Sequence, residues 1–210
     1  MPVRLQLAAL ALGFGTVVFA QNPITADSPF QLRYASHLNV GDSVINITNT
    51  GATTSGATSS NLCVNVYAFS PDEQLVSCCS CTVTPNALVS LSARRDLISN
   101  TLTPAVPTSI VVKLVATAGG SCNAATAGSG TSALATGLAA WGTTVHANTA
   151  APVAEAAITA SVTETAFTPA TLSAAELGRI TALCGFIQSN GSGFGICASC
   201  RLGGLGTSAQ

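Results

Sequence analysis

The stretch Leu62-Cys63-Val64-Asn65-Val66-Tyr67-Ala68-Phe69 carries the clearest strand signal in the chain, because β-branched and aromatic residues dominate it. The turn residues Ser70-Pro71-Asp72-Glu73 follow, and residues 74–78 bring the chain back. Two extended segments joined by so short a turn predict an antiparallel β-hairpin. We therefore expect the fold to be built around this hairpin.

Further strand signals lie on both sides of the hairpin, each bounded by turn residues. They cover residues 30–34, 43–48, 88–92 and 109–116, with weaker signals within 134–147 and 153–166. The segment 109–116 is apolar almost throughout, which favours a central strand. Short strands separated by frequent turns predict a mainly β fold, an immunoglobulin-like or jelly-roll-like β-sandwich.

One helix is predicted near residues 173–189. Ser173-Ala174-Ala175-Glu176 has the pattern of a capping box, in which the Ser and Glu side chains satisfy each other's backbone N–H groups. Apolar residues then recur at helical spacing, and Gly191 supplies a stop: Leu177, Ile180, Leu183, Cys184 and Ile187. The β-sandwich domain, expected over residues 37–210, thus carries one C-terminal helix.

The first twenty residues predict a cleaved signal peptide. Arg4 is followed by an apolar run over residues 5–19, and Val18-Phe19-Ala20 places small residues where signal peptidase needs them. Cleavage is expected before Gln21. A retained membrane anchor is the alternative, but the run is shorter than the about 20 residues that span a bilayer. We expect a secreted, extracellular or cell-surface protein without a membrane span after cleavage.

Residues 21–36 are expected to form an extended N-terminal arm, since Pro23 and Pro29 discourage regular structure near its start. An extended arm of this kind can add a strand to the open sheet edge of a neighbouring molecule. This arm is the segment on which we base an expectation of self-assembly.

The chain has eight cysteines, which in an exported protein predict four disulfides. The candidates are Cys63, Cys78, Cys79, Cys81, Cys122, Cys184, Cys197 and Cys200. Sequence alone does not resolve their connectivity. Local spacing favours Cys184 with Cys197 or Cys200, and Cys63 with a cysteine of the next strand. Adjacent Cys78 and Cys79 should find different partners, because neighbours on a strand point to opposite faces.

Two C-x-x-C spacings leave other chemistries open for these cysteines. Cys78–Cys81 and Cys197–Cys200 could bind a metal together, or act as a redox dithiol. More than a hundred residues separate the two pairs, unlike the compact spacing of zinc ribbons, and the expected compartment is oxidising. We therefore favour disulfides and expect no metal.

Charge is scarce, at 7% of residues against about 25% in typical globular proteins. Seven basic and eight acidic residues give so weak a field that nothing indicates nucleic acid as a partner. Weak charge also lowers repulsion between copies and so favours association. The alternative is that Thr/Ser/Ala-rich, low-charge surfaces are simply common among secreted proteins.

No catalytic constellation stands out. His37 and His146 are expected to have structural roles, and the sequence has no G-x-S-x-G motif to support a triad. Glu164 and the pair Asp72-Glu73 are the nearest carboxylate candidates, with nothing to distinguish them from solvated charges. We expect no enzyme activity and no cofactor.

Several segments resemble a family of secreted, cysteine-containing bacterial proteins for which no activity is known. They are residues 62–67, 78–81, 184–188 and 193–197. The resemblance covers most of the mature chain and implies a shared exported fold. More loosely, Gly41-Asp42-Ser43 and residues 46–51 resemble a strand and turn of immunoglobulin-like surface domains.

These observations predict a secreted structural or interaction protein, a self-assembling subunit of an extracellular fibre or surface layer that uses strand donation. Its partners would be further copies of itself or other surface components. The alternative is a monomeric binding module for a glycan or peptide, with loops at residues 53–61 and 117–132 holding the ligand. A secreted hydrolase is the third candidate.

Overall fold

The computed structural model describes residues 28–51, 61–120, 122–130, 132–146 and 161–200. The predicted signal peptide, residues 1–20, lies outside these ranges. Within them, no helix has the length and apolar character needed to cross a membrane.

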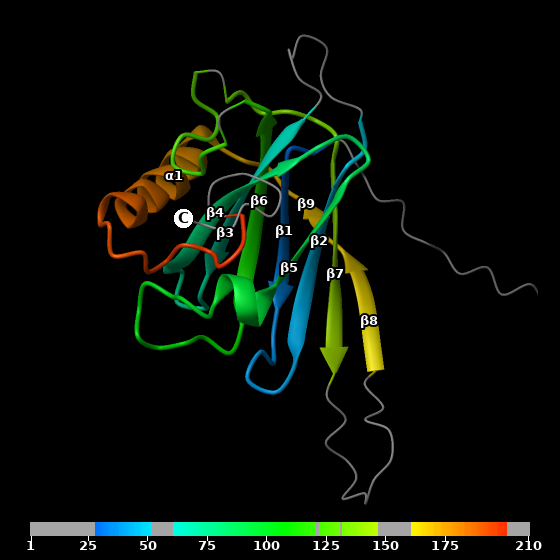
Figure 1. The fold of residues 1–210 in the computed structure, drawn as a ribbon, viewed down its shortest axis with the longest axis vertical. Helices are drawn as coiled ribbons and strands as arrows, with labels where there is room; N and C mark the ends of the chain where they lie inside the picture. Colours follow the sequence, from blue (N-terminus) through cyan, green and yellow to red (C-terminus); the bar gives the residue numbers. More distant parts are fainter. Residues whose placement is uncertain (1–27, 52–60, 121, 131, 147–160, 201–210) are drawn as a thin grey trace, which may run out of the picture.

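Two antiparallel sheets make up most of the described chain (Figure 1). The first contains β1 (Phe30–Ala35), β3 (Leu62–Phe69), β4 (Leu75–Val83), β6 (Ile110–Ala118) and β9 (Thr168–Pro169), in the order β4-β3-β6-β1-β9. The second contains β2 (Asp42–Asn49), β5 (Leu88–Ser92), β7 (Leu138–His146) and β8 (Ser161–Ala166), in the order β5-β2-β7-β8. The mainly β sandwich predicted from the sequence is confirmed.

The strand order favours the immunoglobulin-like of the two predicted sandwiches. β1, β6 and β3 are neighbours in one sheet, and β2, β7 and β8 are neighbours in the other. In chain order and position these six strands match strands B, E and D opposite C, F and G of an immunoglobulin-like domain. β4 and β5 extend the two sheets on the same side of the sandwich. The apolar β6 is the central strand of its sheet, as predicted.

The core lies between the sheets, with a second apolar layer under the helix. Alternate residues of β2 and β3 face inward, including Ile45, Ile47, Val64 and Val66, and all four are fully buried. The opposite face of the first sheet presents Tyr67 and its neighbours to the helix. Because one apolar layer covers each face of the first sheet, every residue of β3 is buried.

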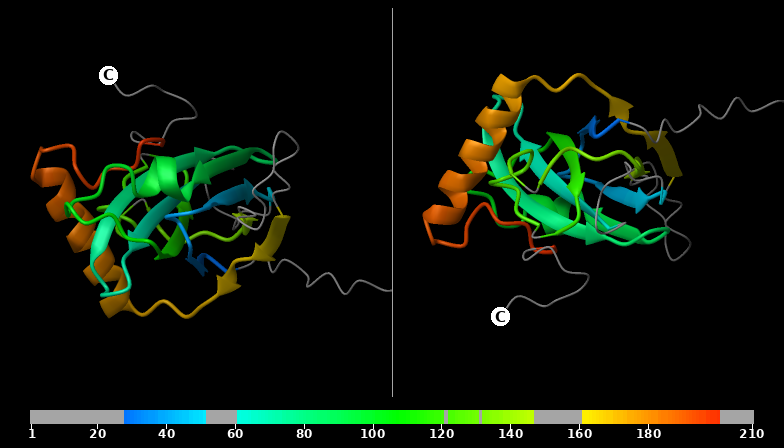
Figure 2. Two further views of the ribbon diagram at one scale, coloured as in Figure 1. Left: turned by 90° about the horizontal axis from the view of Figure 1, so that it is seen from below. Right: turned by 90° about the horizontal axis from the view of Figure 1, so that it is seen from above.

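The helix α1 (Ala174–Ser189) forms where the sequence predicts it. The Ser173 side chain accepts a hydrogen bond from the Glu176 backbone N–H, which caps the first turn. Ile180, Cys184 and Ile187 are the buried residues of its inner face. Glu176 also pairs with Lys113 of β6, the only lysine in the chain. α1 lies at one side of the molecule and β8 at the opposite side (Figures 1 and 2).

The structure corrects the extent of the predicted N-terminal arm. Phe30–Ala35 is not free but forms β1, paired with β6 on one side and with β9 on the other. Residues 21–27 of the predicted arm lie outside the described residues. A strand donated from this segment without disrupting the chain's own sheet must therefore come from the residues before β1.

Candidate functional site: the disulfide ladder and the open strand edge

All eight cysteines pair as disulfides: Cys63–Cys122, Cys78–Cys184, Cys79–Cys197 and Cys81–Cys200. The prediction of four disulfides is confirmed, but both local pairings are wrong. Cys184 bonds to Cys78 of β4 rather than to its near neighbours in sequence. Cys63 bonds outside the hairpin because the register places Thr82, not a cysteine, opposite it on β4.

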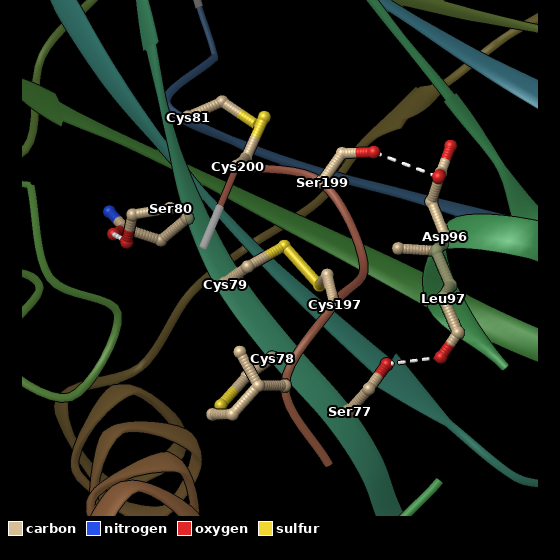
Figure 3. Close-up of a disulfide and its surroundings, with 12 residues drawn as sticks. Ser77, Cys78, Cys79, Ser80, Cys81, Asp96, Leu97, Cys197, Ser199 and Cys200 are labelled. Atoms are coloured by element: carbon tan, nitrogen blue, oxygen red, sulfur yellow. Dashed lines mark hydrogen bonds between the residues drawn. A yellow bond between two sulfur atoms is a disulfide. The ribbon is translucent and has the colours of Figure 1, made fainter. Parts of the chain in front are cut away.

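The alternation of side chains along β4 decides three of the four pairs. Cys78 points to the face covered by α1 and joins Cys184. Cys79 and Cys81 belong to the core between the sheets and join Cys197 and Cys200. Adjacent Cys78 and Cys79 therefore have different partners, as predicted. Figure 3 shows the Cys79–Cys197 and Cys81–Cys200 disulfides next to one another along β4.

The C-terminal strap, defined here as Gly195–Cys200, runs along the outer edge of β4. The Cys78 N–H donates to the Gly195 carbonyl at 2.9 Å, and Cys78 forms a parallel bridge with Ile196. The disulfides from Cys79 and Cys81 then hold the strap in place. The strap thus occupies the backbone groups that an edge strand would offer to another molecule at this point.

Asp96 anchors the strap from its other side. It lies in the short π-helical segment Ala93–Leu97, which follows β5 and was not anticipated from the sequence. Its backbone carbonyl accepts the Ala198 N–H at 2.8 Å, and its carboxylate accepts the Ser199 hydroxyl at 2.8 Å. Figure 3 shows the strap passing between β4 and Asp96. The strap therefore closes this side of the sandwich.

The Asp96 carboxylate is held in its charged form despite being buried. Burial by itself would raise its pKa, but hydrogen bonds from Arg95, the Ser92 N–H and Ser199, with the charge of Arg95, outweigh it. The pKa of Asp96 therefore lies below its ordinary value. A group whose pKa is lowered by folding stabilises the fold above its unfolded-state pKa and loses that effect as the pH falls.

We expect Asp96→Asn to lower the free energy of unfolding by about 1–3 kcal/mol at pH 7, because the hydrogen bonds to a buried charge are lost. The difference from the wild type should shrink as the pH falls below about 4, where the unfolded-state carboxyl is protonated. Urea unfolding at pH 7 and pH 3 measures both effects. Asp72→Asn, in the exposed β3–β4 turn, is the control and should change little. A pH-independent effect of Asp96→Asn would contradict this account.

The remaining titratable candidates are not brought together. His37 hydrogen-bonds with Ser36 in the β1–β2 connection, and His146 with Thr163 of β8. Glu73 lies by Arg179 of α1, whereas Glu164 accepts a hydrogen bond from Thr143 of β7. No nucleophile, base and orienting group meet among these residues.

The cysteines of the two C-x-x-C spacings are used in disulfides, so their thiolates are not free to bind a metal in this form. Within the described ranges, no group of three or more His, Cys, Asp or Glu residues is placed to hold a metal ion. The arrangement is that of a covalent clamp that ties α1 and the strap to one strand.

Of the two loops expected to hold a ligand, only the segment 117–132 lies largely within the described residues. The described parts of the segment 117–132 pack against the sheet and α1. Cys122 bonds to Cys63, Ala124 and Ala127 are buried, and the Tyr67 hydroxyl donates to the Ala124 carbonyl at 2.6 Å. Most of the segment 53–61 lies outside the described residues.

Apart from β8, the sheet edges are shortened or occupied to different extents. The strap covers part of β4. β9 has only two residues, and Pro169 has no N–H to offer. β5 ends at Ser92, whose N–H already donates to the Asp96 carboxylate at 2.7 Å. These features are ones that natural proteins use to protect sheet edges.

β8 is also an edge strand: within the described residues it pairs with β7 alone, and residues 162–166 are all exposed. The Phe167 N–H donates to the Ala140 carbonyl, so these two residues form a hydrogen-bonded pair. In an antiparallel ladder, hydrogen-bonded and non-hydrogen-bonded pairs alternate along the strands. Counting back from Phe167, the backbone groups of Thr163 and Thr165 bond to β7. The backbone N–H and C=O groups of Val162, Glu164 and Ala166 therefore point away from β7, toward the open side of the sheet. β8 is thus an open edge rich in β-branched residues. The sequence carries a weak strand signal within residues 153–166, but its place at a sheet edge was not predicted.

Comparison with protein-family models, with curated proteins and with solved structures finds no match to this chain.

Proposed function

We propose that this chain is a secreted, non-enzymatic structural protein that assembles with further copies of itself through the open edge of β8. The observation that carries the proposal is the exposed ladder of outward-pointing backbone groups on β8, whereas the strap covers part of β4 and β9 has only two residues. An exposed edge of this kind recruits a strand from another chain. Four disulfides support an extracellular setting, because they persist in oxidising compartments.

The donor in this proposal is the segment 21–27 of a neighbouring copy. It directly precedes β1, so an extended conformation there can leave the donor's own sheet intact. Donation from one end of a molecule to an edge on the next is a head-to-tail contact, which propagates into a fibre instead of closing. The scarcity of charge, at 7% of residues, limits repulsion between subunits.

Two substitutions at Glu164 test the role of the β8 edge. Glu164→Pro removes an outward-pointing N–H and leaves the backbone ladder to β7 in place. Glu164→Ala keeps the N–H but loses the same carboxylate and its hydrogen bond from Thr143, so it is the matched control. We expect the mature wild type and Glu164→Ala to form oligomers or filaments, and Glu164→Pro to remain monomeric. Sedimentation velocity and electron microscopy of negatively stained samples measure the difference.

Assembly of Glu164→Pro to the same extent as the wild type would show that the β8 edge is not the contact. Deletion of residues 21–27 tests the donor separately. If that deletion leaves assembly intact while Glu164→Pro abolishes it, the edge is used but the donor is another segment. A wild type that stays monomeric at all concentrations would contradict the whole proposal.

The second candidate function, a monomeric binding module for a glycan or peptide, is weakened by the structure. One of its two proposed ligand loops, 117–132, is packed onto the sheet by a disulfide and by buried alanines. A saturable ligand bound by the monomer would restore this candidate.

A further inference from the structure

One end of the space between the sheets is polar, on the side of the sandwich opposite the strap. In a β-sandwich the inward-facing positions are normally apolar. β2 follows this rule at Ile45 and Ile47 but has Ser43 at the next inward position. β7 has Thr144 opposite Ser43, and β8 has Thr165 opposite Gly142. The apolar core therefore ends before this corner of the molecule.

Arg33 of β1 fills the polar corner from the facing sheet. Its Nε donates to Thr165 Oγ1 at 3.0 Å, its Nη1 to Ser43 Oγ at 2.6 Å and its Nη2 to Thr144 Oγ1 at 2.8 Å. A Cβ atom at Gly142 would lie 1.9 Å from the guanidinium, so the missing side chain of this glycine makes the room for it. Three strands of the second sheet thus converge on one cation from the first.

This cation has no counter-charge within the described residues. The ion pairs there use Arg95, Lys113 and Arg179. The nearby Asp42 carboxylate is directed to Ser92 and Arg94. Partial burial lowers the pKa of Arg33, but a guanidinium stays charged at all ordinary pH values. A half-buried charge surrounded only by neutral hydroxyls is electrostatically uncompensated.

The donor groups at this corner are arranged as an anion would need them. Arg33 has five N–H groups and uses three on the hydroxyls, which leaves two for a ligand. The Thr165 hydroxyl accepts from Arg33 and has its own proton to donate. Thr144 Oγ1 lies 3.5 Å from Ser43 Oγ, and either hydroxyl can be the donor in that contact. The planar guanidinium fork matches carboxylate and sulfate oxygens. Thr165 is exposed and Arg33 is partly exposed, so the group can be reached from solvent.

We propose that Arg33, Thr144 and Thr165 form a binding site for an oxyanion, the carboxylate or sulfate group of an extracellular ligand, at the polar corner where β1 faces β7 and β8. Ser43 and Gly142 position the guanidinium: the first by a hydrogen bond, the second by leaving space. The site uses the inward-facing side chains of β8 and not its outer backbone edge, so it does not depend on the proposed assembly.

Titration of the mature, oxidised chain with sodium sulfate and with sodium acetate, at constant ionic strength in chloride, tests the site. Calorimetry gives the affinity, and backbone amide NMR shifts give the location. We expect saturable binding with shifts centred on β1, β7 and β8. Arg33→Gln should weaken binding about tenfold or more, because a charge-assisted hydrogen-bond pair is lost. A preference for acetate would point to carboxylate ligands, and a preference for sulfate to sulfated ones.

Arg179→Gln is the matched control, because it removes the same charge from an exposed arginine on α1 and should bind like the wild type. Thr165→Val is a second site variant at an exposed position, useful if Arg33→Gln is poorly folded, and it should weaken binding several-fold. The inference is overturned if the wild type binds neither anion saturably. It is also overturned if well-folded Arg33→Gln or Thr165→Val binds as the wild type does, or if Arg179→Gln loses binding to the same extent.

Discussion

Replacing Cys63 and Cys122 together by alanine should lower the free energy of unfolding by about 4 kcal/mol, the largest effect of removing any single disulfide here. This disulfide closes a loop of 59 residues that no other bridge shortens. In the chain-entropy view, a cross-link stabilises the fold by restricting the unfolded chain, and the effect grows with the size of the loop it closes. Its loss also frees the segment that packs over Tyr67.

The pair Cys81→Ala and Cys200→Ala is the matched control. Its cysteines are 119 residues apart, against 59 for Cys63 and Cys122, and each pair has one buried and one partly buried member. However, Cys79–Cys197 already holds the chain beside this bridge, so Cys81–Cys200 closes a further ring of only about five residues. We expect a loss of about 2 kcal/mol or less. Urea unfolding under oxidising conditions compares the two. Equal losses of stability, or a larger loss for Cys81–Cys200, would contradict the view that Cys81–Cys200 adds only a small ring to the one already closed by Cys79–Cys197.

Tyr67→Ala should be comparably destabilising, by about 4 kcal/mol, because it empties a fully buried aromatic site. Tyr67 lies on β3 at the face covered by α1. Its hydroxyl donates to the Ala124 carbonyl at 2.6 Å and so ties the segment after Cys122 to the sheet. Tyr67→Phe retains the ring and removes only this bond, so we expect a loss of about 1–3 kcal/mol.

The same hydroxyl should add a component to alkaline unfolding. Burial raises the pKa of Tyr67, because the phenolate would lose its hydration. A raised pKa means that the stabilisation is complete below the unfolded-state pKa of about 10 and is lost as the pH rises above it. The stability difference between the wild type and Tyr67→Phe should therefore shrink above pH 10 and stay constant from pH 6 to 9. A difference that stays constant through pH 11 would contradict this assignment.

Local signals were sufficient for most of the individual elements. The β-branched and aromatic residues of 62–69 predicted β3 with its bounds, and the apolar segment 109–116 predicted a central strand. The capping box at Ser173 predicted the start of α1. Each of these signals comes from residues close in sequence. The same side chains favour the backbone conformation and supply the buried face, so the local preference agrees with the final fold. Of the weak strand signal within 153–166, residues 161–166 form β8, and residues 153–160 lie outside the described ranges.

The partners of the cysteines were beyond local reasoning. A disulfide needs Cα atoms within about 7 Å, and the pairs on β4 join residues more than a hundred positions apart. Cys184 was expected to close a local clip with Cys197 or Cys200. The α1 axis instead lies across the outer face of β4, which brings Cys184 to Cys78. The packing of a helix on a sheet depends on both surfaces, so the spacing of one segment cannot specify it.

By itself the sequence determined the class of fold, the number of disulfides, the central strand and the C-terminal helix, because hydrophobic patterning, capping and cysteine parity are local properties. Only the tertiary structure decided which edges are covered, since the strap reaches β4 through contacts with Asp96 and two disulfides. Only the tertiary structure also placed Arg33 among Ser43, Thr144 and Thr165. These residues come from four strands in two sheets, and their meeting depends on how the sheets face one another, which no single stretch of sequence records.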